Sequence, residues 1–318
     1  MKIVIAIAGL AVVGAVGAFG YHHHINTQAQ EGLDNYLEEL TASHQFSAAS
    51  YDSISVSFGG TVTIERVSLT PIDSEEAVVI QHVEAFNIDL SHDVPHTMNV
   101  IMSGIELNEK AQVQLAGDNA ALGQYLRSIV TGNVLPFNAE MSYVYNEADE
   151  KEQNTQFSFG LDDVARYEMF IQTKNIPIEL MFQTDRDDPA AQAEAMQAVY
   201  AASLPSFSVS IEDLGGVNSL MKIYAEEAQV SEEELREQMI EGLSAMALQM
   251  LPPGLEDFSH DSLAELNNFL LGGKRLSVAL SPAHDGNIEK LQPELMSAFM
   301  EEDFEAIIEL LQLEVVAM

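Results

Sequence analysis

Residues 51–69 read YDSISVSFGGTVTIERVSL and alternate apolar with polar side chains on both sides of a Gly-Gly pair. Serines separate the apolar residues before the glycines, and threonines separate them afterwards. This period of two puts the apolar side chains on one face of an extended strand. Gly59-Gly60 suits the tight turn between antiparallel strands. The stretch therefore predicts a β-hairpin with one apolar and one polar face.

Similar alternation continues through the first half of the chain. The further candidate strands are Phe86–Leu90, Met98–Leu107 with a bulge at Gly104, Met141–Tyr145, Phe157–Leu161, Tyr167–Ile171 and Ile176–Phe182. One helix is expected among them, over Asn119–Val130, where apolar residues follow a helical spacing. Short strands in this arrangement predict an antiparallel β-meander in which each strand has one solvent-exposed face and one buried face.

The second half of the chain mixes helices with strands. Ser231 and Glu234 have the spacing of a capping box, which predicts a helix start there. The other expected helices are Asp188–Ser203, a segment after Gly215-Gly216, Asp261–Leu270, Leu295–Met300 and Phe304–Leu311, and the expected strands are Phe207–Ile211, Leu276–Leu280 and a last one through Leu313 and Val315. The sequence therefore predicts the α+β class, with helices interspersed in the second half.

The amino terminus predicts a membrane segment. Ile3–Gly20 holds no charged residue, and a helix of this length spans about 27 Å, close to the roughly 30 Å of a hydrocarbon core. The pattern also fits an export signal cleaved after Gly17 or Ala18. We favour an uncleaved anchor, because the apolar core is long for a signal. Lys2 favours an amino end in the cytoplasm.

A stalk helix is expected after the anchor, because Leu33, Tyr36, Leu37 and Leu40 follow helical spacing. The predicted organisation is a transmembrane anchor or signal at 1–20, a stalk helix at 21–45, a mainly antiparallel β region at 46–186 and a mixed α+β region at 187–318 that packs on the first. The predicted location is the inner membrane, with a single pass and the carboxy-terminal domain in the periplasm. The alternative is a cleaved protein that is soluble in the periplasm.

Composition excludes several classes of function. The chain has 50 acidic and 13 basic residues and a net charge of −37, so its surface repels nucleic-acid phosphates and anionic lipid headgroups alike. A hydrophobic content of 47% argues against a disordered acidic chain. The acidity is spread along the sequence, which leads to the hypothesis of a saline habitat. The absence of cysteine excludes disulfides, thiolate metal sites and cysteine nucleophiles.

Motifs for catalysis or for cofactors are absent from the sequence. There is no Gly-x-Ser-x-Gly, no Gly-x-Gly-x-x-Gly, no P-loop and no His-Glu-x-x-His. His22, His23 and His24 are interpreted as a polar collar at the membrane exit. His92 and His96 have a metal-like spacing on a helix, but Pro95 blocks a helix, so a turn is favoured. We expect no enzyme, no cofactor and no metal site; a hydrolase is the minor alternative.

The two ends of the chain carry a resemblance. The amino-terminal anchor, the helix after it and residues 51–69 resemble the opening of AsmA-like periplasmic proteins and of uncharacterised membrane-anchored periplasmic families of proteobacteria. The run KRLSVALSP at 274–282 resembles the closing part of the uncharacterised families. The resemblance implies an inner-membrane-anchored envelope protein with strands curved around an apolar groove. It also implies phospholipid handling, although this chain is much shorter than the large AsmA-like proteins.

The predicted function is a non-enzymatic, membrane-anchored periplasmic protein that handles lipid or another apolar envelope ligand. The alternative is an envelope scaffold or assembly partner that acts through protein–protein contacts. The partners expected are thus the membrane, lipid and envelope proteins, and no nucleic acid. The residues expected to line an apolar groove are Ile54, Val56, Phe58, Ile176, Ile178, Leu180 and Phe182. A competing hypothesis is that these residues cover the core of the domain.

Overall fold

The structure is a computed structural model. It describes residues 25–42, 46–57, 59–72, 77–89, 92, 95–106, 120–148, 151–176, 197, 198, 200–250 and 255–318. The predicted anchor Met1–Gly20 and the three histidines that follow it lie outside the described residues. Of the helices that the structure describes, none combines the length and the hydropathy that crossing a bilayer requires.

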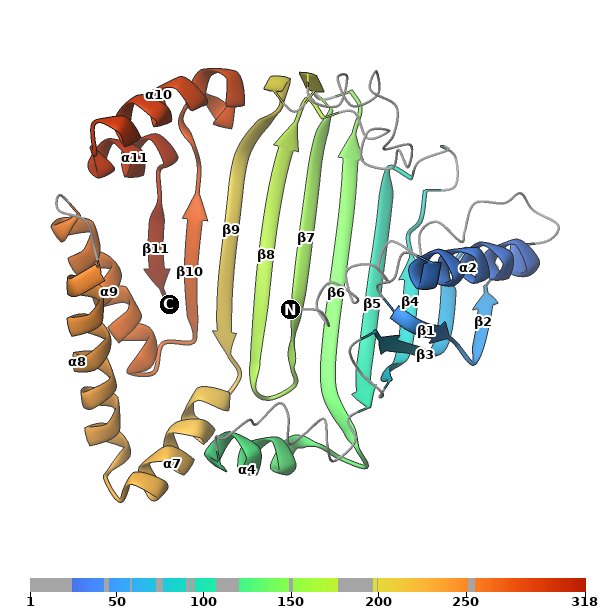
Figure 1. The fold of residues 1–318 in the computed structure, drawn as a ribbon, viewed down its shortest axis with the longest axis horizontal. Helices are drawn as coiled ribbons and strands as arrows, with labels where there is room; N and C mark the ends of the chain where they lie inside the picture. The colour runs from blue at the N-terminus through green and yellow to red at the C-terminus, as the bar shows by residue number, and fades with distance from the viewer. Residues whose placement is uncertain are drawn as a thin grey trace. The chain divides into compact units, whose positions relative to one another are not determined.

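Eleven strands and seven α-helices in the described part of the chain confirm the α+β class. The strands form one antiparallel sheet in the order β1-β3-β4-β5-β6-β7-β8-β9-β10-β11, with β2 also paired to β3 (Figure 1). From β3 onward each strand lies beside the next strand of the chain, as expected for a meander. The strands are β1 (Phe46–Ser50), β2 (Ser53–Val56), β3 (Val62–Pro71), β4 (Val78–Phe86), β5 (Thr97–Glu106), β6 (Val134–Asn146), β7 (Glu152–Leu161), β8 (Ala165–Lys174), β9 (Ser203–Asp213), β10 (Arg275–Leu280) and β11 (Glu314–Ala317).

The chain divides into two compact units. Unit 1 comprises Met1–Val144 and Phe157–Asp162, and unit 2 comprises Tyr145–Gln156 and Asp163–Met318. Strands β6 and β7 therefore contribute residues to both units. The boundary expected at residue 186 lies inside unit 2.

The predicted hairpin is formed by β2 and β3. Ile54 pairs with Ile64, and Val56 pairs with Val62. The turn is closed by the Ser57 N–H, which donates to the Thr61 carbonyl at 2.9 Å, and Gly60 adopts a φ of 81°. A positive φ carries little cost for glycine, which explains the Gly-Gly pair at this turn.

Strand β4 corrects one expectation. The predicted strand Phe86–Leu90 is wrong, because β4 covers Val78–Phe86 and ends where that prediction began. Asn87 takes a left-handed conformation with φ 53°, which turns the chain out of the strand. The bulge expected at Gly104 is confirmed: the register of β5 against β6 shifts between Ser103 and Ile105, and Gly104 has φ 69°.

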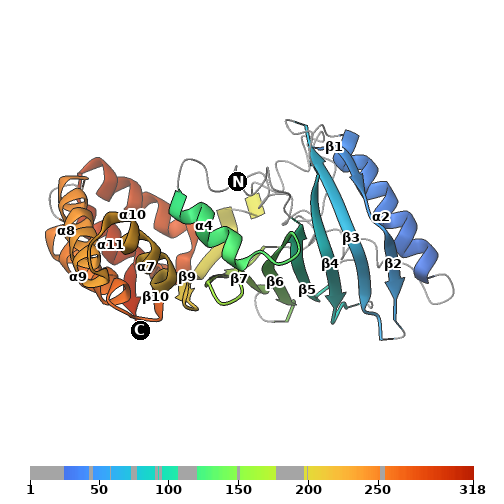
Figure 2. The same cartoon turned by 90° about the horizontal axis from the view of Figure 1, so that it is seen from below.

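The core of unit 1 lies between its sheet and helix α2 (Ile25–Ala42). Figure 2 shows α2 alongside β1, β2 and β3. Leu33 is 1% exposed and Leu37 is 5% exposed, and both belong to the same core cluster as Val67 and Val100. The amphipathic segment expected to be a stalk is therefore a part of the folded unit. Helix α4 (Ala120–Ile129), predicted from its spacing, adds Leu126 to this core.

Unit 2 carries the remaining described helices. They are α7 (Gly216–Ala228), α8 (Glu232–Met250), α9 (Glu256–Leu270), α10 (Ile288–Met300) and α11 (Phe304–Leu311), with a 3-10 turn η1 (Ala283–Gly286) before α10. The capping box is confirmed: the Glu234 N–H donates to Ser231 Oγ at 3.1 Å, and the Ser231 N–H donates to Glu234 Oε2 at 3.0 Å. The Ser231 hydroxyl also donates to Glu234 Oε2 at 3.0 Å, and the bonds from the Ser231 N–H and from this hydroxyl lower the pKa of the Glu234 carboxyl.

Candidate functional site

Strands β8 to β11 of unit 2 share one face whose central part is apolar or aromatic. The register pairs Met169 of β8 with Val209 of β9, and Val209 with Val278 of β10. Paired residues in an antiparallel sheet point to the same face, and so do residues two positions away along each strand. This apolar face comprises Tyr167, Met169 and Ile171 of β8, Phe207, Val209 and Ile211 of β9, Leu276, Val278 and Leu280 of β10, and Val315 and Ala317 of β11.

The opposite face of the same strands carries serines and ion pairs. Arg275 Nη2 lies 2.7 Å from Glu168 Oε2. Glu168 pairs in register with Ser210, which is only 5% exposed. Arg166 and Glu212 form a second, longer pair at 3.9 Å. A long charged side chain thus lies opposite the small serine in the register.

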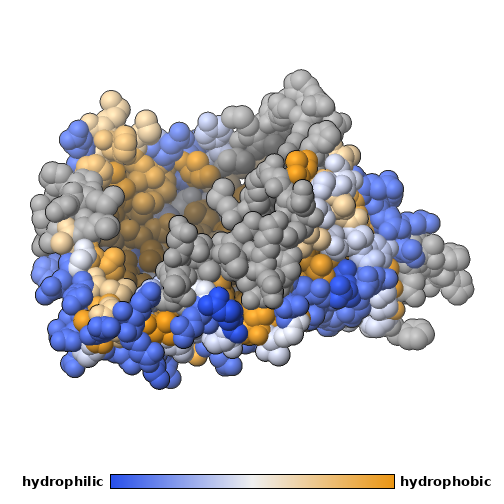
Figure 3. Space-filling view, turned by 60° about the horizontal axis from the view of Figure 1, so that its bottom comes forward, coloured by the Kyte–Doolittle hydropathy of each residue, from blue (hydrophilic) through white to orange (hydrophobic). Residues whose placement is uncertain are grey.

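The apolar face is the more open of the two at its centre. Tyr167 is 42% exposed, and Val209 and Val278 are each 38% exposed. These residues come from three neighbouring strands, which lie about 4.8 Å apart in a sheet. Figure 3 shows an apolar hollow in its left part, where Figure 1 draws the strands and helices of unit 2. A contiguous exposed apolar surface of this kind is typical of a binding site.

Two helices add further apolar surface to unit 2. Helix α11, which leads into β11, has no residue that is fully buried. On α10, Met296, Phe299 and Met300 are 54%, 65% and 79% exposed. Their spacing puts these three side chains on one side of the helix. Unit 2 therefore exposes apolar side chains from both its sheet and its helices.

The side chains of the apolar face favour contact with other apolar groups over contact with water. None of its residues carries a charge, and Tyr167 supplies its one hydroxyl group. Covering such a surface is favourable by roughly 25 cal/mol for each Å² of apolar area removed from water. The face is suited to bind an apolar group, and its own side chains offer no acid–base pair for catalysis.

The residues expected to line a groove lie elsewhere in the chain. Ile54 and Val56 are half-buried on β2 and pack against the core of unit 1. Ile176 is half-buried and follows the end of β8. Phe58, Ile178, Leu180 and Phe182 lie outside the described residues. None of the described three belongs to the apolar face.

Sequence reasoning found the strands of the apolar face but did not assign them a binding role. Phe207–Ile211 and Leu276–Leu280 were expected as strands with apolar and polar residues in alternation, and β9 and β10 confirm them. The pattern around Val209 resembles the pattern around Ile64, which is 2% exposed. Alternation identifies which side chains share a face, but it carries no signal for whether that face is covered.

The comparisons with known proteins concern the same part of the chain. The chain belongs to a family described as "Uncharacterized protein", whose model matches residues 158–318, half of the chain. No curated protein and no solved structure matches the chain. The matched residues include all of β8, β9, β10 and β11, and thus the whole apolar face.

Proposed function

We propose that this chain is a non-enzymatic, inner-membrane-anchored periplasmic protein that holds the acyl part of a lipid on the apolar face of β8 to β11. The exposure of Val209 and Val278 at the centre of that face carries the proposal. A hydrocarbon chain that covers this exposed valine pair removes apolar surface from water, which lowers the free energy.

The composition of the face favours a lipid over a polar small molecule. Specific binding of a polar ligand needs hydrogen-bonding or charged groups at defined positions. The apolar face has only the Tyr167 hydroxyl for this purpose. A hydrocarbon chain requires no such partner, so area and shape alone suffice for it.

The sequence supports a lipid source. The predicted anchor Met1–Gly20 would keep the folded domain beside a bilayer, where lipid is the most abundant apolar ligand. The resemblance to AsmA-like proteins points in the same direction, since phospholipid handling is what it implies.

The test uses full-length protein purified from its own membranes and extracted for lipid mass spectrometry. The variant V209K/V278E puts an opposite-charge pair at the centre of the apolar face without changing the net charge. The matched control S208K/A279E makes the same pair on the opposite face of the same strands, where Ser208 and Ala279 are partners in register. We expect about one lipid per chain in the wild type and in the control, and none in V209K/V278E.

Two results would contradict this function. A wild-type protein free of lipid would exclude it. Equal lipid content in V209K/V278E and S208K/A279E would exclude the apolar face as the binding surface. Far-UV circular dichroism of all three proteins controls for folding.

The second candidate function is an envelope scaffold, and the exposed side of α10 favours it. Met296, Phe299 and Met300 form an apolar strip that a partner protein would cover. A photo-crosslinking residue at Phe299 is expected to capture one envelope protein in cells, whereas the same residue at the exposed Ser297 is not. Absence of any product at Phe299, or equal products at both positions, would contradict this candidate.

A further inference from the structure

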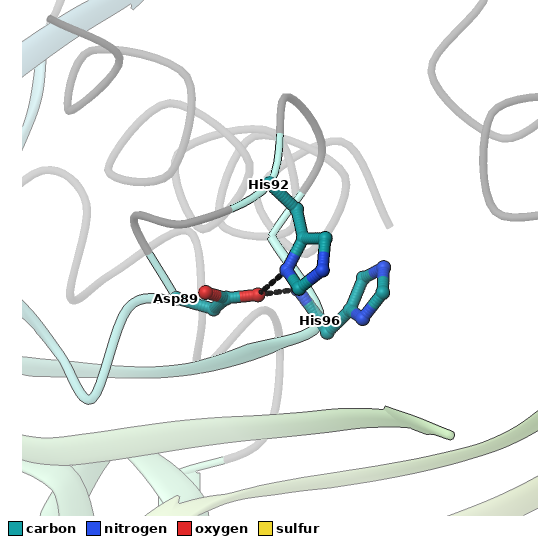
Figure 4. Close-up of side chains that lie close together, drawn as sticks. All are labelled: Asp89, His92 and His96. Atoms are coloured by element: carbon teal, nitrogen blue, oxygen red, sulfur yellow. Dashed lines mark hydrogen bonds and ion pairs between the residues drawn. The ribbon is translucent and has the colours of Figure 1, made fainter. Parts of the chain in front are cut away.

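The connection between β4 and β5 brings two histidines and an aspartate together (Figure 4). His92 Nδ1 lies 2.5 Å from Asp89 Oδ2. The rings of His92 and His96 stack with centroids 3.8 Å apart and planes at 11°. One ligand atom from each of the three residues lies within 4.8 Å of the other two.

Backbone bonds hold the carboxylate of Asp89 in place. The Asp89 N–H donates to the Thr97 carbonyl at 2.9 Å, at the start of β5. The His96 N–H donates to Asp89 Oδ2 at 3.1 Å, and Thr97 Oγ1 donates to the Asn87 carbonyl at 3.0 Å. These bonds tie the two ends of the connection together, so that Asp89 and His96 are positioned before any ligand arrives.

We propose that Asp89, His92 and His96 bind a divalent transition-metal ion of the zinc class. Two imidazole nitrogens and one carboxylate oxygen suit zinc and its neighbours, whereas calcium and magnesium prefer oxygen ligands alone. Zinc bonds of 2.0–2.2 Å place the donor atoms of a tetrahedral site about 3.3 Å apart. Donor atoms within 4.8 Å of one another are close to that spacing, and the two stacked rings must turn apart for both imidazole nitrogens to point at one ion.

Pro95 does not prevent metal binding by His92 and His96, because these residues lie in a loop. Pro95 excludes a helix over these residues, but the ligands come from a loop in which Pro95 is buried and His96 stands beside it. The side chain of His92 is 49% exposed, which gives an ion access from water, and that of Asp89 is 16% exposed. The net charge of −37 also raises the concentration of cations at the surface.

The proposed site closes the loop between two strands of unit 1. A bound ion would compete with the hydrogen bond between His92 and Asp89, because histidine binds metal through an unprotonated nitrogen. Three protein ligands leave the fourth coordination position to water, and none of them belongs to the apolar face.

The experiment titrates full-length protein in detergent, freed of metal with a chelator, with Co²⁺ as a visible probe. The parent protein carries H22A, H23A and H24A, which removes the other run of neighbouring histidines. We expect one Co²⁺ to bind per chain, with the d–d absorption spectrum of Co²⁺ at a low coordination number. An equal amount of Zn²⁺ is expected to displace the Co²⁺. Calcium is expected to leave the spectrum unchanged.

Three variants locate the site. Loss of an outer-shell partner alone costs about 10–100-fold in metal affinity, so H92A and H96A are each expected to weaken Co²⁺ binding by at least about tenfold. The matched control is H82A, since His82 also lies beside carboxylates, with Nδ1 3.1 Å from Glu65 Oε1. H82A is expected to bind Co²⁺ as the parent does.

A thermal measurement guards against misfolded variants. Zinc is expected to raise the melting temperature of the parent and of H82A, and to leave that of H92A unchanged. Binding that survives in H92A and H96A, or that falls equally in H82A, would overturn the proposal. The absence of Co²⁺ binding by the parent would overturn it as well.

Discussion

Val209 and Val278 are direct partners across β9 and β10, and 38% of each residue is exposed to water. Ser210, which follows Val209 and points to the other face, is 5% exposed. An ordinary two-faced sheet buries its valines and exposes its serines. Unit 2 reverses this order at the centre of its sheet.

The stability of valine-to-threonine variants measures this reversal. V209T and V278T are each expected to change the free energy of unfolding by less than about 1 kcal/mol, because the new hydroxyl reaches water. The control V100T is expected to cost about 1–3 kcal/mol, because Val100 is 0% exposed in the core of unit 1. Urea unfolding measures all three. A cost for V278T equal to that for V100T would show that the apolar face is covered.

Gly286 offers a test of the contact between η1 and β9. A Cβ added to Gly286 would lie 2.0 Å from the Leu204 carbonyl oxygen, whereas one added to Gly132 would meet nothing within 4 Å. Both glycines have positive φ, 65° and 58°, so an alanine suffers similar backbone strain at either position. G286A is therefore expected to destabilise the protein by about 1–3 kcal/mol more than G132A. Equal melting temperatures for the two variants would contradict the close approach.

Tyr51 predicts a loss of stability at alkaline pH. Burial of its phenol, together with the hydroxyl that donates to Asp34 Oδ1 at 2.8 Å, raises the pKa of Tyr51 to about 12. The folded state thus favours the neutral phenol more than the unfolded state does, where the pKa is about 10. The contribution of Tyr51 to the free energy of unfolding is complete below about pH 10 and is lost as the pH rises toward 12. The urea midpoints of wild type and Y51F are expected to converge over this range; a constant difference would contradict the assignment.

The charge of the chain predicts a strong response to salt. A net charge of −37 repels itself, and NaCl shortens the Debye length from about 30 Å at 0.01 M to about 3 Å at 1 M. The melting temperature is therefore expected to rise with NaCl over that range. A melting temperature that stays level would count against a saline habitat as the cause of the acidity.

Local patterns predicted those parts of the fold that depend on neighbouring residues. The β2–β3 hairpin followed from alternation and from a glycine turn, and the start of α8 followed from Ser231 and Glu234. Strand β4 was missed because Gln81 and His82 interrupt its apolar pattern, although His82 pairs in register with Glu65 of β3 and Ser103 of β5. Pairing with β3 and β5 determined that strand, and a single segment of sequence does not contain this information.

The candidate sites depend on how the chain bends and packs, which the spacing of residues does not show. Val209 and Ile64 follow the same alternation, and only the packing around them makes one exposed and the other buried. Asp89 joins His92 and His96 because the left-handed Asn87 and the bond to Thr97 bend the loop back. The spacing in the sequence identified only His92, His96 and Pro95. The bend of the loop is what brings the carboxylate of Asp89 to the two histidines.

The order of the strands has a consequence for how the chain is made. A nascent polypeptide appears amino end first, whether it leaves a ribosome or a translocation channel. From β3 to β9 each new strand finds its partner already present beside it, so that pairing can keep pace with emergence. Strand β11 is the last to pair, and it pairs with β10. A chain halted before Glu314 would leave the backbone groups on that edge of β10 unpaired, where they could bind another chain.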